Sequence, residues 1–599
     1  MLDTNNAEWE IWLQKWFTWL LVPAILINAG GLLIPILEPD GSLYASIAKT
    51  IAHSGDFVNL RVEGKDWLDK PHFPFWIAAI SIRFFGANAF AYKFPALLFW
   101  AAGAWYTFRL ALSLYGKPVA QLATLIYVSA AHLVISNNDV RAEPYMTGLI
   151  IGSVYHFYKA SRTRPGLHLV IGSLLAACAV MTKGPFVLIT IAAGFLLDWI
   201  VGKEWEQFRN IRWWIAILLT ALFTLPELIC LYLQFDQHPE KVVFGHTGVS
   251  GIRFFFWDSQ FGRFFNTGPI KGAGDPFFYF HTLLWAFLPW SLILYAAIVR
   301  KCRRSTGNTG NSLHRRSVTG DYICLGAALA SFIVFSLSRF QLPHYLNILF
   351  PFFSMLAAGY LYGIRRRWTQ RMIGIIQGFI NIVLPLLLLV ICWFFHFPSW
   401  PFLMVLLVLL SFLPFVLFRG SQLPVSIARS FWMAMLAFAF VNFILYPAIL
   451  KYQAGTRAGL ALTKLAKSGL EEAYYDMSPF PRPPDTDSIQ LRHWLKGGGR
   501  INKSVIYTLE EAPANYSFDF YCQRPIQRLS MDSLDAHLIK GPVYVFAPAT
   551  FVDSLKKRGF MTQNIEQFPN FHVSQLTGQF LDYRTRNTVL EMYALFLVN

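Results

Sequence analysis

Long apolar runs, each followed by a polar loop, recur along this sequence and restrict its fold more than any other property. A helix needs about 20 apolar residues to cross the hydrocarbon core of a bilayer. Only 14% of the residues are charged, against about 25% in soluble domains. We therefore expect a mainly α-helical, polytopic membrane protein. About thirteen membrane-spanning helices are predicted by the length criterion, at 16–37, 94–113, 118–136, 143–158, 168–182, 184–201, 211–233, 277–299, 320–338, 342–363, 371–395, 399–418 and 427–450.

The loops between these runs differ in charge. If the N-terminus is cytoplasmic, the loops after even-numbered spans are short and basic, as cytoplasmic loops usually are. They contain or flank Lys117, Lys159, Arg162, Arg164, Lys203, Arg300, Arg315, Arg316, Arg365, Arg366, Arg367, Arg419 and Arg429. The net charge of +17 is thus an orientation signal, and nucleic acid is not expected as a partner.

The same topology places two long loops and the C-terminal segment on the outer face. In the first loop, 38–93, residues 41–53 and 73–85 have helical periodicity but are too short to span, so we expect helices lying in the interface. After 455 the composition becomes mixed. Residues 456–599 are expected to form a small soluble α/β domain, with strands at 504–508 and 542–546 and helices at 531–539 and 549–558. Residues 1–455 then form the transmembrane part.

Four isolated charges fall on the outer side of this topology. Asp40, Lys70, Glu143 and Lys183 lie at span ends or in the first loop. A charge at membrane depth costs about 2.5–3.5 kcal/mol on insertion scales, so it usually faces a cavity or a partner. Any one of them alone could be an interfacial anchor or part of a structural ion pair, but together they predict one site. Glu227, inside the seventh span, could line the same cavity or be structural.

Short motifs accompany these charges in a fixed order. They read EPDGSLYA at 38–45, DKPHFPFW at 69–76, RAE at 141–143, TKGP at 182–185, GRF at 262–264, LPWS at 288–291, SRFQLPHY at 338–345 and NYSFDFY at 515–521. In this order the sequence resembles the C-type glycosyltransferases of the protein O-mannosyltransferase and aminoarabinose transferase group. Two positions depart from the pattern of that group: Gly41 stands where many members carry a second acid, and Gln341 where many carry Lys.

The resemblance implies a glycosyltransferase whose donor is a sugar on a polyprenyl phosphate, and an inverting reaction. Positive charge is needed near a leaving phosphate, and Lys70, Arg263, Lys183 and Arg339 are the candidates. Asp40 is the candidate base and Glu143 its helper or the residue that orients the acceptor. Further substrate contacts are expected from Tyr44, His344, Tyr345 and Glu38. The acceptor stays open between lipid A, a protein and another glycan.

No cofactor is expected to be required, and a divalent metal held by some of the outer histidines stays open as an alternative. His53, His72, His246, His281 and His344 lie near the outer face, but none has the spacing of a common metal motif. Two other readings remain: a lipid or glycolipid transporter, for which we see no internal repeat, and a non-catalytic assembly or sensor protein. The expected setting is a bacterial inner membrane with the site facing the periplasm.

Overall fold

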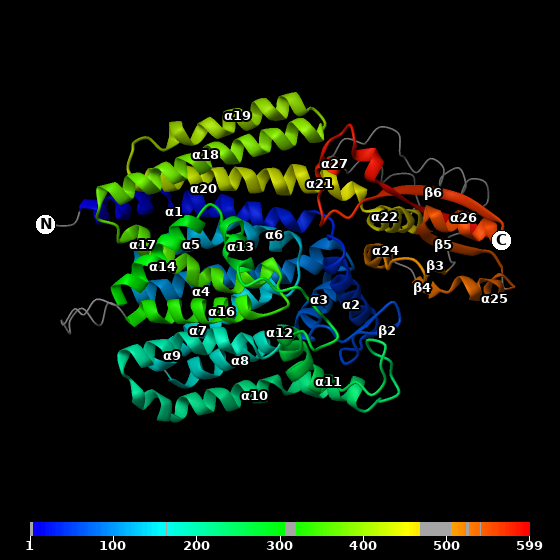
Figure 1. Ribbon diagram of the computed structural model, residues 1–599, viewed down its shortest axis with the longest axis horizontal. Coiled ribbons are helices and arrows are strands. Elements are labelled where there is room, and N and C mark those ends of the chain that lie inside the picture. Colours follow the sequence, from blue (N-terminus) through cyan, green and yellow to red (C-terminus); the bar gives the residue numbers. More distant parts are fainter. Residues whose placement is uncertain (1–3, 163–164, 306–318, 468–504, 523–525, 540) are drawn as a thin grey trace.

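The computed structural model describes residues 4–162, 165–305, 319–467, 505–522, 526–539 and 541–599. The long helices run side by side across the view of Figure 1, and the C-terminal sheet lies beyond one end of them. The N-terminus lies at the opposite end. Of the residues considered above, Arg164, Arg315, Arg316 and Ser504 lie outside the described residues.

Helices make up most of the described residues up to Lys467. Their bounds are α1 Thr4–Gly30, α2 Asp40–Ser54, α3 Phe73–Phe85, α4 Ala89–Tyr115, α5 Lys117–Val128, α6 Ala131–Asn138, α7 Glu143–Arg162, α8 Pro165–Lys183, α9 Val187–Gly202, α10 Ile211–Leu231, α11 Gly251–Arg253, α12 Arg263–Phe265, α13 Phe278–Ala286, α14 Ser291–Ser305, α16 Thr319–Leu337, α17 Phe350–Tyr362, α18 Arg367–Phe395, α19 Trp400–Leu417, α20 Leu423–Phe440, α21 Tyr446–Ile449 and α22 Ala454–Lys467. A two-stranded hairpin, β1 Arg61–Val62 and β2 Lys65–Asp66, interrupts the first loop.

Eight helices of the described residues are long and apolar enough to cross a membrane, or nine if the bent pair α5 and α6 is one span. The protein is thus a multi-pass membrane protein. Several of the thirteen expected spans take another form. Residues 118–136 fold as α5 and α6 with a bend of 50° between them, 277–299 divide into α13 and α14, and α9 is only 16 residues long.

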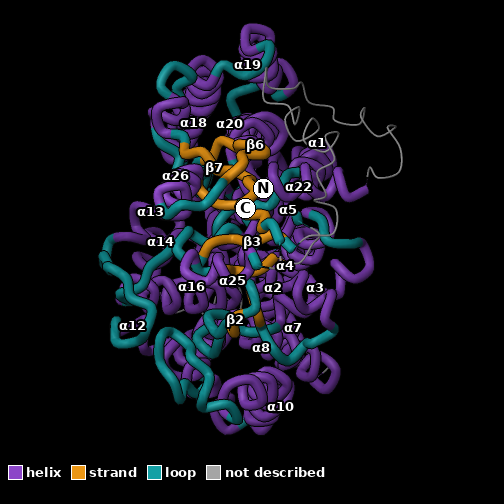
Figure 2. Tube along the Cα trace, turned by 90° about the vertical axis from the view of Figure 1, so that its right-hand side faces the viewer, coloured by secondary structure: helices purple, strands orange, loops and turns teal. Residues whose placement is uncertain are grey.

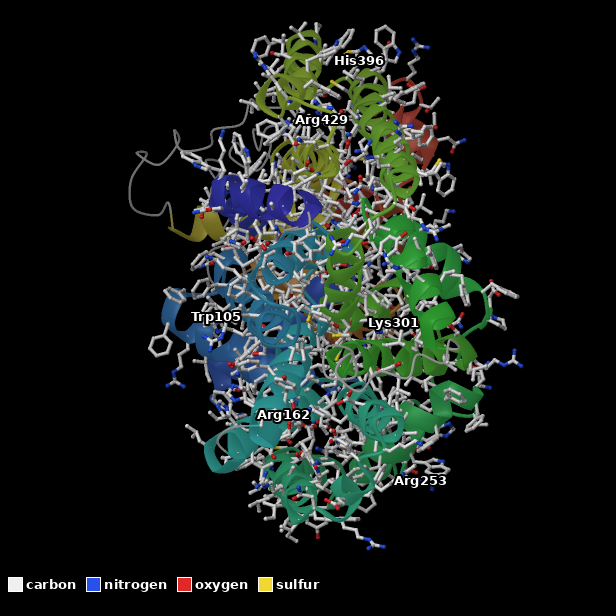
Figure 3. All side chains as sticks on the ribbon, turned by 90° about the vertical axis from the view of Figure 1, so that its left-hand side faces the viewer. Trp105, Arg162, Arg253, Lys301, His396 and Arg429 are labelled. Atoms are coloured by element: carbon white, nitrogen blue, oxygen red, sulfur yellow. The ribbon has the colours of Figure 1, made fainter. Side chains whose placement is uncertain are left out.

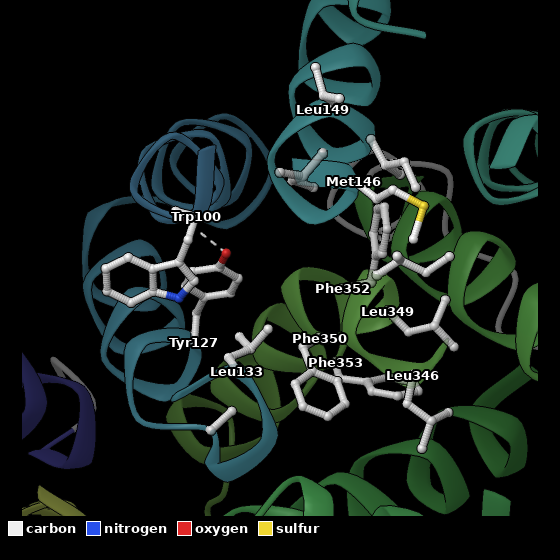
Figure 4. Close-up of a cluster of buried hydrophobic side chains, with 14 of the residues drawn as sticks. Trp100, Tyr127, Leu133, Met146, Leu149, Leu346, Leu349, Phe350, Phe352 and Phe353 are labelled. Carbon is white, nitrogen blue, oxygen red and sulfur yellow. Dashed lines mark hydrogen bonds between the residues drawn. The ribbon is translucent and has the colours of Figure 1, made fainter. Parts of the chain in front are cut away.

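The centre of the helical part is packed by large side chains from α4, α5, α7 and α17, and Figure 4 shows this cluster. Trp100 and Tyr127 stack with ring centroids 6.1 Å apart, and the Tyr127 hydroxyl donates to the Trp100 carbonyl at 3.1 Å. Because α7 is surrounded by other helices, its residues from Glu143 to Phe157 are all buried. The core thereby fixes the helix that begins with Glu143.

The C-terminal region folds as expected into a small α/β unit. Its elements are β3 Ile506–Leu509, α24 Tyr516–Tyr521, β4 Ile526–Leu529, α25 Leu534–Leu538, β5 Val543–Pro548, α26 Ala549–Lys557, β6 Thr562–Asn570, α27 Gly578–Leu581 and β7 Glu591–Val598. The strands form one sheet in the order β4-β3-β5-β7-β6, parallel at β4-β3-β5 and antiparallel at β5-β7-β6. Figure 2 looks onto this sheet in front of the helices.

The side chains of β5 point alternately to the two faces of the sheet, and both faces are covered by other elements. Tyr544 and Phe546 belong to the cluster that includes residues of α22 and α24, whereas Val543 and Val545 belong to the cluster that includes residues of α26. This period of two is that of a strand, and apolar side chains on both faces bury all of β5. The sheet is therefore the centre of its own small core.

Candidate functional site

A cavity of about 180 Å³ lies between the first loop, α7 and α8, and the segments that carry Arg263 and His344. Its lining consists of Asp40, Leu43, Tyr44, Asp69, Lys70, Arg141, Ala142, Glu143, Lys183, Arg263, Ile270, Phe340, Leu342, His344 and Tyr345. Eight of the ten residues expected from the sequence are among them. The two that are not are Glu38 and Arg339. The cavity thus brings together residues that are far apart in the chain, from Asp40 to Tyr345.

Asp40 is the carboxylate most open to this cavity, with 44% of its side chain exposed. It is the first residue of α2, where a negative charge interacts favourably with the helix dipole. Arg141 Nη1 lies 2.7 Å from its Oδ2, and the Arg141 guanidinium also donates to Asp139 at 2.6 and 3.0 Å. Burial lowers the pKa of Arg141, but Asp139 and Asp40 more than compensate, so the pKa is raised above its ordinary value. A permanently charged guanidinium therefore holds Asp40 in place.

A second group of charges lies across the cavity, on the loop before α3 and on α12. Asp69 forms ion pairs with both Lys70 and Arg263. Burial favours the uncharged form of each group, but the two cations hold the pKa of Asp69 below its usual value. The pKa of Lys70 is lowered to about 8, because burial outweighs the opposing effect of Asp69. The guanidinium of Arg263 also lies 5.4 Å from the centre of the Phe340 ring.

The third group of charges in the cavity lining is the pair Glu143 and Lys183. Glu143 lies in the first turn of α7 and Lys183 in the last turn of α8. Each charge is thus at the favourable end of its helix dipole. The two form a buried ion pair, and His344 Nε2 lies 3.5 Å from Glu143 Oε1. The ammonium of Lys183 also sits 4.0 Å from the centre of the Tyr345 ring, within cation–π range.

Tyr44 reaches the cavity one turn after Asp40 on the same helix. Its ring packs edge-on against Trp67 and Phe75, at centroid distances of 5.8 and 5.4 Å. Burial and the nearby carboxylates raise the pKa of its hydroxyl well above the ordinary value. Tyr44 is therefore a neutral hydrogen-bonding group at the wall.

Glu227 lies behind the cavity, in an adjoining pocket that shares Asp69, Lys70, Lys183 and Arg263 with it. Its carboxylate accepts from the backbone N–H of His72 at 3.0 Å and contacts His72 Nδ1 at 2.9 Å. Both side chains are fully buried. Of the two roles considered for Glu227, the contacts support the structural one, because they tie the first loop to α10.

Glu38, Arg339 and Gln341 face other parts of the molecule. Glu38 Oε1 is buried without a hydrogen bond among the described residues, and burial raises the pKa of Glu38 to about 7. Arg339 is exposed on the loop after α16. The Gln341 amide donates to the carbonyls of Phe335 and Ser336 at 3.3 and 3.1 Å. Gln341 therefore caps the end of α16 and does not line the cavity.

Three charged residues of this region were not among the sequence candidates. Asp69 and Arg141 stand beside Lys70 and Glu143 within the quoted motifs, and Asp139 precedes Arg141 by two residues. In the sequence, these three residues were indicated only by their closeness to the candidates Lys70 and Glu143. Within the described ranges, no three His, Cys, Asp or Glu side chains gather closely enough to hold a metal ion.

Comparison with known proteins gives related matches for the first part of the chain. Residues 38–241 match the family described as dolichyl-phosphate-mannose-protein mannosyltransferase. That stretch contains Asp40, Tyr44, Lys70, Glu143 and Lys183. The chain is 27% identical over 387 residues to an undecaprenyl phosphate-alpha-4-amino-4-deoxy-L-arabinose arabinosyl transferase of Edwardsiella ictaluri, covering 62% of this chain and 63% of that protein. A similarly named protein of Pseudomonas fluorescens is 25% identical over 340 residues, 55% of each chain.

The fold extends further than the sequence similarity. The crystal structure of ArnT from Cupriavidus metallidurans bound to undecaprenyl phosphate superposes with a TM-score of 0.69 at 15% identity, over 97% of this chain and 98% of that one. Its apo structure gives the same TM-score. The two proteins therefore share one architecture, including the C-terminal unit.

Proposed function

We propose that this chain is a C-type glycosyltransferase of the group that includes ArnT, and that it transfers a sugar from a polyprenyl phosphate to an acceptor with inversion at the anomeric carbon. One observation carries the proposal. An open carboxylate, Asp40, faces a cavity that is also lined by the cations Lys70, Arg263 and Lys183. This is the charge arrangement that displacement of a phosphate by a nucleophile requires.

The leaving group is the polyprenyl phosphate. As the bond from the anomeric carbon to the phosphate oxygen breaks, negative charge grows on that oxygen, and preorganised cations stabilise it. Lys70 and Arg263 are suited to this role because Asp69 contacts both and aligns them on one side of the cavity. Since the phosphate leaves as an anion, no general acid is needed.

Asp40 is proposed as the base for a hydroxyl acceptor. The hydroxyl oxygen attacks the anomeric carbon from the face opposite the phosphate, and its proton passes to a carboxylate oxygen of Asp40. Glu143, held by Lys183 and His344, orients the acceptor. Tyr44 and Tyr345 supply further contacts to the sugar. If the acceptor is a phosphate, it arrives largely deprotonated and Asp40 orients it instead.

The names of the relatives suggest the donor class. We propose an undecaprenyl-phosphate-linked aminopentose or a similar sugar as the donor, with lipid A, a protein or another glycan as the acceptor. We place the protein in a bacterial inner membrane with the cavity on the periplasmic side. The distribution of basic residues supports this orientation: α7 runs from Glu143 at the cavity to Arg162 at the far end. Figure 3 shows that end of the molecule, with Arg162, Lys301 and Arg429 labelled.

The test is release of polyprenyl phosphate by the purified protein from a panel of polyprenyl-phosphate sugars, each offered with candidate acceptors. Wild type is compared with Asp40→Asn and Lys70→Ala. We expect release by wild type and a loss of about 100-fold or more in each variant, the range typical of acid–base and electrostatic groups. No release from any donor by a folded protein would contradict the proposal and favour a transport or assembly role.

A further inference from the structure

Asp139 is a carboxylate behind the cavity that the proposed mechanism leaves without a role. It follows α6, and its backbone N–H is fixed by a hydrogen bond to the Ile135 carbonyl at 3.0 Å. Its Oδ2 accepts from both Nε and Nη2 of Arg141, at 3.0 and 2.6 Å. The remaining donor nitrogen, Nη1, then points to Asp40 at 2.7 Å. Asp139 thereby fixes the orientation of the Arg141 guanidinium, whose remaining nitrogen contacts Asp40.

The second oxygen of Asp139 explains the glycine after Asp40. Oδ1 is buried and accepts no hydrogen bond from the described residues. A Cβ atom on Gly41 would lie 3.1 Å from this oxygen and 3.3 Å from Ile36 Cγ2. Both distances are shorter than ordinary van der Waals contacts. The carboxylate of Asp139 therefore fills the space into which a side chain at position 41 would project.

We propose that Asp139 is a positioning residue that holds Arg141 against Asp40, and that positions 41 and 139 are alternative places for this one carboxylate. The proposal rests on the transferase function above, because Asp40 is the group whose placement matters. The ion pair between Arg141 and Asp40 is made at Oδ2 of the Asp40 carboxylate. Because 44% of the Asp40 side chain is exposed, its other oxygen, Oδ1, is open to a substrate.

The relation between the two positions provides the test. Removing the Asp139 side chain frees the space beside Gly41, so a carboxylate introduced at 41 can occupy it. The variants are Asp139→Asn, Asp139→Gly, Gly41→Asp, and the double variant Asp139→Gly with Gly41→Asp. The control is Asp198→Asn, since Asp198 is also buried, with an oxygen that accepts no hydrogen bond from the part of the chain that the structure describes, but it lies in α9, away from the cavity. Release of polyprenyl phosphate is measured with the donor and acceptor that wild type turns over fastest.

We expect Asp139→Asn and Asp139→Gly to lower kcat about tenfold, with KM for the donor changed less than about threefold, because the loss affects the reacting group and not donor binding. Gly41→Asp alone should also lower kcat, since two carboxylates then compete for one space. The double variant should recover most of the loss seen in Asp139→Gly. A uniform structural defect would not produce recovery by a second substitution.

Three possible results distinguish these hypotheses. Each is measured with protein that is monodisperse in size-exclusion chromatography. Wild-type kcat in Asp139→Asn and Asp139→Gly would overturn the positioning role and leave the proposed function standing. A double variant no more active than Asp139→Gly would overturn the equivalence of the two positions. Wild type without any release, in contrast, would contradict the proposed function itself and this inference with it.

Discussion

Among the single residues of the cavity, Lys70 has a pKa that brings the loss of its charge close to neutral pH. Burial lowers its pKa to about 8, against about 10.4 for a free lysine. A lysine is charged below its pKa, so the ammonium is present at neutral pH and is lost as the pH rises through about 8. We expect kcat/KM for the donor to fall over that range, because this parameter reports the free enzyme.

Lys70→Arg is the matched variant for this prediction. A guanidinium stays charged throughout the range, although its geometry differs from that of an ammonium. The absolute rate is expected to fall, while the alkaline decline of kcat/KM should disappear or move to higher pH. A decline near pH 8 that is identical in Lys70→Arg would show that another group titrates there.

The same residues show how far a sequence can predict a site. Asp40, Glu143 and Lys183 stood out because a charge next to an apolar span needs a partner or a cavity. Asp139 and Arg141 did not stand out, since a sequence does not show that one guanidinium will contact two carboxylates from different parts of the chain. Arg339 was chosen for its charge and motif, yet only the path of the loop after α16 decides that it points outward.

At the level of elements, a buried ion pair joins the first loop to α10. His72 Nδ1 contacts Glu227, and His72 Nε2 lies 2.9 Å from the Val58 carbonyl, so both ring nitrogens face acceptors. Burial alone would lower the pKa of His72, but Glu227 and the carbonyl raise it above its ordinary value. Because this loop carries Asp69 and Lys70, the pair stabilises one wall of the cavity.

Glu227→Gln is expected to cost about 3 kcal/mol of stability, within the range for breaking a buried pair. A group whose pKa is raised on folding stabilises fully below its unfolded pKa and loses this effect as the pH passes its folded pKa. The difference in Tm between wild type and Glu227→Gln should therefore be largest below about pH 6.5 and shrink as the pH rises above that value. Glu240→Gln, which breaks the exposed pair with His238, is the control and should leave Tm unchanged. A difference independent of pH would contradict the charged pair.

The packing of α7 on α4 gives a second prediction for an element. A Cβ atom on Gly148 would lie 2.1 Å from the carbonyl oxygen of Phe99, a backbone atom that cannot rotate away. We expect Gly148→Ala to push α7 off α4 and destabilise the protein by about 1–3 kcal/mol or more. Gly378→Ala, in α18, meets nothing within 4 Å and should be neutral or slightly stabilising. Equal Tm values for the two variants in detergent would contradict this account.

Elements also show which features follow from the local sequence and which depend on the rest of the fold. Helices α2 and α3 were expected at 41–53 and 73–85 and are observed within about a residue of those limits, because helical periodicity is a local property. The number of membrane-spanning helices is not a local property, because it depends on how neighbouring helices pack. An apolar run such as 118–136 has the right length, but the bend between α5 and α6 depends on neighbours such as Trp290, whose indole donates to Ser129 Oγ at 2.9 Å.

In the whole molecule, the C-terminal unit contacts the helix that presents Asp40. Lys49, near the middle of α2, donates to the backbone carbonyls of Asp519 and Cys522, the second at 3.3 Å. The Ser46 hydroxyl donates to the Tyr516 carbonyl at 2.9 Å. These acceptors lie in or next to α24, so the C-terminal unit contacts α2 along the stretch that follows Asp40. We infer that it acts as a support for the site and not as a separate binding module.

Lys49→Met is expected to loosen this support. The variant keeps the length of the buried side chain but removes its hydrogen bonds to two carbonyls, which for a charged donor are worth about 1.5–3 kcal/mol. Residues 40–54 should then exchange backbone hydrogens faster in the full-length protein, and kcat should fall although Lys49 does not line the cavity. Lys65→Met removes a pair with Glu510 at the exposed rim of the same contact, where such pairs contribute little, and it should alter neither quantity. If Lys49→Met leaves both exchange and kcat unchanged, the C-terminal unit does not position α2, and its role must lie in recognition of the acceptor.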